Sequence, residues 1–178
     1  MPETIISWTN FTWNPVHGCS KVSEGCRNCY AERISLQKGF TKKPWTKPNE
    51  AENVQLKPHK LREPYRFPAG SRVFVNSMSD LFHDQIPDSY LAKVFKVMND
   101  LPEITFQVLT KRPKRAAEWP GPWTPNIWMG TSVEDGRVLW RLDALRPCNA
   151  RTLFISFEPL IGSIESPDLT GFHWAIVG

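Results

Sequence analysis

The apolar residues of the chain gather in short runs that are separated by polar and proline-rich segments. Runs of β-branched and aromatic residues are typical of buried strands, whereas apolar residues at helical spacing predict amphipathic helices. Strands are predicted from Arg72 onward (Val-Phe-Val-Asn) and at Ile104–Leu109, Ile127–Gly130, Thr152–Phe157 and His173–Val177. Helices are predicted at Asn28–Lys38, Pro87–Met98 and Val138–Leu145, with a basic connection around Ala116 and Ala117.

The predicted strands and helices alternate, and the strands are apolar on both faces. This order is typical of an α/β fold with a parallel sheet, because the helices that connect parallel strands cover the sheet. Successive right-handed crossovers curl such a sheet into an open or closed barrel. We therefore expect a partial (β/α) barrel of parallel strands.

One long connection interrupts this order. Residues 39–71, directly after the first predicted helix, are rich in Pro and Lys and favour an extended, loop-rich stretch. We expect a single domain of residues 1–178 that carries this segment as an insertion. No helix is predicted after the last strand, so we expect either a C-terminal truncation or a partner that completes the layer.

The composition indicates a folded cytoplasmic protein. The 178 residues are enough for one sizeable core, and no apolar run reaches the roughly 18 residues that a membrane helix needs. The N-terminus lacks the basic and then apolar layout of a signal peptide. In a reducing compartment the four cysteines, three of them within eleven residues, are better explained as metal ligands or catalytic thiols than as disulfides.

The charge is modest overall and uneven along the chain. The formal net charge is +4, but the segment Lys38–Arg72 carries nine Lys or Arg against three Glu. A second basic cluster contains Lys111, Arg112, Lys114 and Arg115. Such clusters fit a nucleic acid or a phosphate-bearing substrate, and an ordinary solvated surface is the simpler alternative.

The three clustered cysteines, Cys19, Cys26 and Cys29, have the spacing C-x6-C-x2-C. Three thiolates from one loop can ligate three irons of a 4Fe-4S cluster and leave the fourth iron open to a small molecule. Zinc is the alternative, since His17 would complete a Cys3His set. We favour iron–sulfur because zinc modules usually place their second ligand pair much further along the chain. The fourth cysteine, Cys148, is expected to be a buried small residue.

Several segments of the chain resemble an uncharacterised family of phage and bacterial proteins with a three-cysteine motif. That family is itself distantly similar to the radical S-adenosylmethionine (SAM) enzymes. The segments that carry the resemblance are Trp13–Cys19, Gly25–Glu32, Phe74–His83, Leu109–Arg112, Gly130–Asp135 and Ile155–Leu160. The likeness runs over nearly the whole chain.

The resemblance implies a cofactor pair and a reaction class. SAM would bind the open iron, and the reduced cluster would donate one electron to the sulfonium to give methionine and a 5′-deoxyadenosyl radical. A reductant protein would supply that electron. The protein would position the cofactor and exclude water.

Polar residues at the ends of the predicted strands are the candidate SAM-binding groups, because ligands of parallel sheets bind at the carboxyl ends of the strands. These candidates are Asn76, Ser77, Ser79, Asp80, Lys111, Ser132, Glu134 and Glu158. Turn formation or helix capping is the alternative for the residues after Val75, and an exposed lysine is the alternative for Lys111. For Glu134 and Glu158 the alternative is a salt bridge to Arg112 or Arg151.

Two functions remain open from the sequence. The first is a radical SAM-like enzyme that acts on a nucleic acid or nucleotide. The second is a non-catalytic protein in which a cluster or zinc stabilises the fold and the basic segments bind nucleic acid or another protein.

Overall fold

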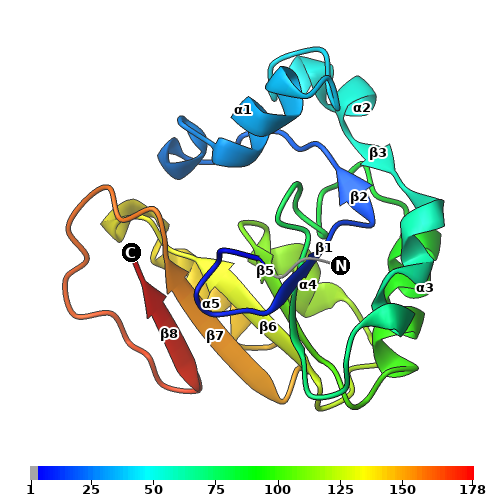
Figure 1. Cartoon of the computed structure of the whole chain (residues 1–178). Coiled ribbons are helices and arrows are strands. Elements are labelled where there is room, and N and C mark those ends of the chain that lie inside the picture. The colour runs from blue at the N-terminus through cyan, green and yellow to red at the C-terminus, as the bar shows by residue number, and fades with distance from the viewer. Residues whose placement is uncertain (1–3) are drawn as a thin grey trace.

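The centre of the fold is a parallel sheet of six strands, seen in the computed structural model, which describes residues 4–178 (Figure 1). The strand order is β1-β4-β5-β6-β7-β8, and every neighbouring pair is parallel. The strands are β1 (Phe11–Trp13), β4 (Arg72–Val75), β5 (Thr105–Thr110), β6 (Ile127–Ser132), β7 (Thr152–Phe157) and β8 (Trp174–Val177). Because every neighbouring pair is parallel, all six strands have their carboxyl ends at one edge.

Helices cover the sheet and supply much of the core. They are α3 (Asp88–Asn99), α4 (Pro113–Glu118) and α5 (Trp140–Leu145), the last preceded by the 3-10 turn η5 (Gly136–Val138). On α3 the apolar residues Leu91, Val94 and Phe95 are fully buried at helical spacing. They belong to the same core cluster as Val75 and Phe106 of the sheet.

The remaining elements form an arch beside the sheet (Figure 1). It contains β2 (Val16–His17), η1 (Glu24–Cys26), α1 (Tyr30–Gln37), η2 (Lys47–Asn49), α2 (Glu50–Asn53), β3 (Gln55–Leu56), η3 (Pro58–Arg62) and η4 (Pro64–Arg66). The two short strands β2 and β3 pair antiparallel. Residues 39–71 are therefore short pieces of secondary structure with loops between them, and Trp45 within them is buried.

The α/β class and the parallel sheet are confirmed, and all five predicted strands are present. Three features differ from the prediction: β1 is an additional strand, β2 and β3 form a second small sheet, and the basic connection around Ala116 is the helix α4. The sheet is open, with β1 and β8 as its edges, and residues 4–178 form no closed barrel. No helix in this part of the chain is long and apolar enough to cross a membrane.

Candidate metal and cofactor site

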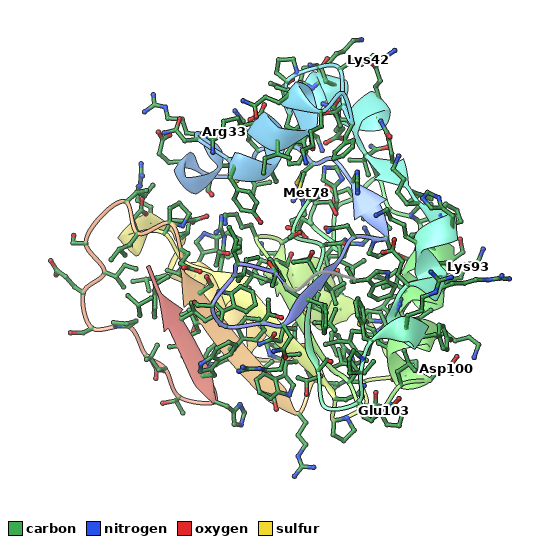
Figure 2. The ribbon with its side chains drawn as sticks, viewed as in Figure 1. Arg33, Lys42, Met78, Lys93, Asp100 and Glu103 are labelled. Atoms are coloured by element: carbon green, nitrogen blue, oxygen red, sulfur yellow. The ribbon has the colours of Figure 1, made fainter. Side chains whose placement is uncertain are left out.

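The cysteine loop lies across the carboxyl ends of the central strands. Its start is fixed by a hydrogen bond of 3.0 Å from the Gly18 amide to the Met78 carbonyl, after β4, and Figure 2 labels Met78 between the arch and the sheet. Its middle is fixed by Ser23, whose hydroxyl donates to Glu134 after β6. Gly18 has a φ of +85°, and a Cβ there would lie 1.9 Å from the Asn53 carbonyl oxygen. Only glycine fits this close approach of the loop to the end of α2.

The three thiols of the loop are free and half-buried. Arg112, at the end of β5, donates from Nη1 to Cys19 Sγ at 3.5 Å and from Nη2 to the Ser20 carbonyl at 2.9 Å. Burial raises the pKa of the Cys19 thiol to about 12, and the Arg112 charge opposes that rise. Cys26 Sγ lies 3.8 Å from the Ser23 hydroxyl. A guanidinium beside a cysteine favours the thiolate that a metal requires.

The donor set fits an iron–sulfur cluster in its chemistry, because three free thiols from one loop are what such a site uses. Within residues 4–178, no three His, Cys, Asp or Glu side chains lie close enough together to form a metal-binding group. The thiols must therefore turn toward one another to share one metal centre.

His17, the expected fourth ligand of a zinc site, is surrounded by positive charge. It is buried on β2 with its ring 5.2 Å from that of Phe40. Its pKa is lowered to about 4, first by burial and then by Lys60 and Lys57. A site flanked by two lysines disfavours a divalent cation, so these contacts favour a cluster on the cysteines over Cys3His zinc.

The Asp80 carboxylate already accepts several hydrogen bonds from the protein. It is buried and accepts hydrogen bonds from the Thr110 hydroxyl (2.6 Å), the Lys111 amide (3.0 Å) and Arg112 Nη1 (3.1 Å). Burial alone would raise the pKa of this carboxyl, but Arg112 and these donors outweigh it and hold the pKa below its usual value. Asp80 therefore orients Arg112 toward Cys19 and has few lone pairs left for a cofactor.

Asn76 is a polar group of the same edge whose side chain lacks hydrogen-bond partners within residues 4–178. It follows β4 with a φ of +66° and is only 2% exposed. Neither its amide oxygen nor its amide nitrogen has a hydrogen-bond partner among the described residues. Its neighbour Ser77 is engaged instead, since its hydroxyl and the Asn14 amide lie 3.0 Å apart. A buried amide without partners costs about 1–3 kcal/mol, which a bound ligand would recover.

Glu134 is the centre of a buried ion-pair cluster. It is 1% exposed, and its carboxylate lies 2.9 Å from Arg141 Nη1 and 3.2 Å from Lys111 Nζ. Arg141 Nη1 also donates to the Ser132 carbonyl at 2.8 Å. The predicted salt bridge of Glu134 is thus present, but its partners are Lys111 and Arg141 rather than Arg112 or Arg151. One carboxylate faces two cations, so one positive charge is left over.

Glu158 lies after β7, close enough to Tyr30, the residue after the last cysteine, to affect its pKa. It accepts a hydrogen bond of 3.2 Å from the Ser156 hydroxyl. Burial, and then the charges of Cys29 and Glu158, raise the pKa of Tyr30 to about 12. The Tyr30 hydroxyl in turn donates to the Ser77 carbonyl at 2.9 Å. The structure thus brings the candidates from four strand ends to the same edge as the cysteine loop.

A buried polar network beside Cys19 was not predicted from the sequence. Ser20 donates to Glu50 Oε2 at 2.9 Å and lies 2.8 Å from His83 Nε2. His83 Nδ1 accepts from the Gln85 amide at 3.1 Å, so Nε2 carries the proton of the neutral ring and donates to Ser20. This network ties the cysteine loop to α2 and does not activate Ser20 as a nucleophile.

Stability is expected to fall with acidification between pH 6.5 and about 4. The pKa of His83 is lowered to about 4 by burial and then by Arg112. Because the unfolded histidine takes up a proton at about pH 6.5 and the folded one does not, each such residue costs up to about 3 kcal/mol as the pH falls through this window. Urea unfolding from pH 7 to 4 measures the slope.

The His83→Gln variant is expected to remove about half of that slope, because His17 contributes a similar shift. His59→Gln is the matched control, since His59 is exposed on η3. A slope in His83→Gln equal to that of the wild type would contradict the assignment.

Comparison with known proteins finds a family but no characterised relative. No curated protein and no solved structure matches the chain. The model of one family, described as a protein of unknown function (DUF5131), matches residues 3–178, which is nearly the whole sequence. The chain therefore belongs to the DUF5131 family of proteins of unknown function.

Proposed function

We propose that this protein is an iron–sulfur enzyme of the radical SAM type, of phage or bacterial origin, in which Cys19, Cys26 and Cys29 hold a 4Fe-4S cluster. The observation that carries the proposal is the position of the loop. Three free thiols of one loop lie across the carboxyl ends of parallel strands. That edge is where α/β sheets and barrels bind ligands.

The open six-stranded sheet is consistent with a partial (β/α) barrel. Its strands follow one another in chain order from β4 to β8, as in barrels built from successive crossovers. The candidate polar residues occupy the ends of β4, β5, β6 and β7. A cofactor at this edge would contact side chains from several strands at once.

The bound cluster would supply one electron to the sulfonium of SAM, and the protein's residues would hold SAM in place. Asn76 offers a buried amide with both a free donor and a free acceptor. Lys111 and Arg141 share the single carboxylate of Glu134. The positive charge of Lys111 is therefore only partly balanced, which suits the carboxylate of SAM. Ser77, Ser132 and Glu158 complete the polar edge. Asp80 acts by positioning Arg112.

The proposal includes a compartment and two partners. Free thiols and a reducible cluster require a reducing environment, so we place the protein in the cytoplasm. A reductant protein supplies the electron. The substrate is a nucleic acid or a nucleotide, as the basic clusters suggest.

The decisive test is anaerobic reconstitution of the full chain with iron and sulfide, followed by reduction with dithionite in the presence of SAM. We expect about four irons per chain, the broad visible absorption of thiolate-bound iron, and the formation of 5′-deoxyadenosine. Uptake of one zinc with no cluster would refute the proposal. A full cluster without 5′-deoxyadenosine would refute the reaction class alone.

The alternative, a non-catalytic protein whose fold is stabilised by a cluster or zinc, is less well supported. A structural metal contributes most to the stability of a fold where it restrains a loop that nothing else holds. Here the loop is already held by the contacts of Gly18, Ser20 and Ser23. Zinc-dependent folding of the full chain would favour this alternative.

A further inference from the structure

A pocket lies directly beside the cysteine loop. Its volume is about 530 Å³, and Val22 of the loop forms part of its wall. Basic residues and one tryptophan dominate the lining, namely Lys111, Arg112, Lys114, Arg115, Trp140 and Arg141. Arg112 belongs to both sites, because it lines this pocket and contacts Cys19 Sγ. A ligand in the pocket would therefore lie next to the cysteine site.

Two lysines of the pocket lack a carboxylate of their own in the described part of the chain. Arg115 is paired with Asp88, and Arg112 with Asp80. Glu134 is shared by two cations, however, and Lys114 makes no ion pair among residues 4–178. The pocket's own carboxylates are Asp84, which lies 3.7 Å from Lys47, and Glu118. The five cations of the pocket are thus matched in number by the carboxylates of Asp80, Asp84, Asp88, Glu118 and Glu134. The positive charge open to a phosphate is local and lies at Lys114.

Trp140 gives the pocket an aromatic wall. Its side chain is 46% exposed although it begins a helix whose neighbours Arg141 and Leu142 are buried. Lys114 Nζ lies over its ring, 5.5 Å from the centre, and Arg141 Cζ lies 5.9 Å from the same centre. A base that stacks on Trp140 would take the place of the Lys114 ammonium, which would then be free to meet the phosphate. An exposed indole beside a lysine is the arrangement with which proteins bind an unpaired base and its phosphate.

We propose that this pocket binds a nucleoside phosphate of a single-stranded nucleic acid, with the base stacked on Trp140 and the phosphate held by Lys114. Stacking requires a base that is free of a duplex, which is why the strand must be single. The inference rests on the proposed function as far as it places a substrate next to the cysteine site. The binding step itself requires neither cluster nor SAM.

Fluorescence anisotropy of a labelled single-stranded oligonucleotide with the full chain tests the proposal in the absence of SAM and reductant. Trp140→Ala is expected to weaken binding by about fivefold to a hundredfold, the usual effect of losing one stacked base, while Trp140→Phe retains most of it. Lys114→Ala is expected to lower the slope of log affinity against log salt by about 0.7, the value for one phosphate contact to a single strand.

Matched controls separate this pocket from general surface charge. Lys93 on α3 is exposed, lies outside the pocket and points into solvent in Figure 2, so Lys93→Glu changes the net charge as Lys114→Glu does. Tyr65 is an exposed aromatic elsewhere and serves as the control for Trp140. We expect Lys93→Glu and Tyr65→Ala to bind like the wild type and Lys114→Glu to bind at least about tenfold more weakly.

Competitors identify the source of the ligand. If AMP displaces the labelled oligonucleotide as well as an unlabelled oligonucleotide of equal nucleotide concentration does, the ligand is a mononucleotide. If only the unlabelled oligonucleotide displaces it, the ligand is a nucleic acid. Either result supports the pocket. Equal displacement by inorganic phosphate or polyglutamate, tighter binding of a duplex, or unchanged affinity in Trp140→Ala would overturn the proposal. Because no turnover is measured, these outcomes are independent of the test for 5′-deoxyadenosine.

Discussion

A Cys26→Ala variant is expected to take up no 4Fe-4S cluster and to form no 5′-deoxyadenosine. The proposed site has three thiolate ligands, all from one loop, and Cys26 is the middle one. Without it two thiolates remain, which do not retain a cube of four irons. Iron analysis after anaerobic reconstitution should fall from about four irons per chain to nearly none, and the visible absorption should disappear with it.

Cys148→Ala is the matched control for this loss. Cys148 is also a free cysteine, but it is buried in the core with its Sγ 3.8 Å from the Ala116 carbonyl oxygen, and burial raises its pKa to about 11. We expect this variant to retain a full cluster. A full cluster in Cys26→Ala would show that the ligand set is wrong, and loss in both variants would point to misfolding instead.

The parts of the fold that could be predicted are those in which local sequence and tertiary position agree. Strands β5 and β7 are six-residue runs rich in β-branched and aromatic residues and mostly buried, and α3 shows clear helical spacing over three turns. In these elements the burial that stabilises the structure is visible as a pattern in the sequence.

Strand β1 was missed because its stability is not local. It has three residues, Phe11–Trp13, which are too few to show a period. Its strand conformation comes from pairing with β4 about sixty residues later, where Phe11 lies opposite Val73. The Trp13 indole donates to the Lys60 carbonyl at 2.8 Å, which ties the strand to the insertion. Such distant pairings leave no signal in a single short segment.

Helix α4 was missed for a related reason. It has six residues, less than two turns, and begins at Pro113, a residue suited to the first turn of a helix. Its Lys and Arg residues read as a basic connection. Only Pro113 and Ala116 are buried in it, so no apolar stripe marks it as a helix.

The sequence predicted which polar residues lie at the strand ends, but it did not predict which of them contact one another. Glu134 and Lys111 were both identified because each follows an apolar strand, yet their pairing depends on β5 and β6 being neighbours. Arg141 carried no signal, since an arginine in a short helix is usually exposed. Arg141 is buried because it pairs with the Glu134 carboxylate, which follows β6.

Glu134→Ala is expected to destabilise the protein by about 3–5 kcal/mol. The substitution leaves the Arg141 guanidinium, which is 1% exposed, without its carboxylate. A buried charge that loses its partner is among the costliest changes in a folded protein. The glycine at position 25 packs directly on this carboxylate, since a Cβ there would lie 2.3 Å from Glu134 Cγ, so the loss also loosens the cysteine loop.

Urea unfolding followed by far-ultraviolet circular dichroism measures this cost, and Glu118→Ala is the control. Glu118 is an exposed carboxylate on α4 without an ion pair among the described residues, so its removal should change the free energy of unfolding by less than about 0.5 kcal/mol. Glu134→Gln separates charge from shape, because the amide oxygen can still accept from Arg141, and the amide nitrogen can donate to the Ser23 hydroxyl, while the charge is gone. Its cost should lie between the two. A loss below about 1 kcal/mol in Glu134→Ala would mean that water or a rearranged Arg141 replaces the carboxylate, and that the pair does not hold the cysteine loop against the sheet.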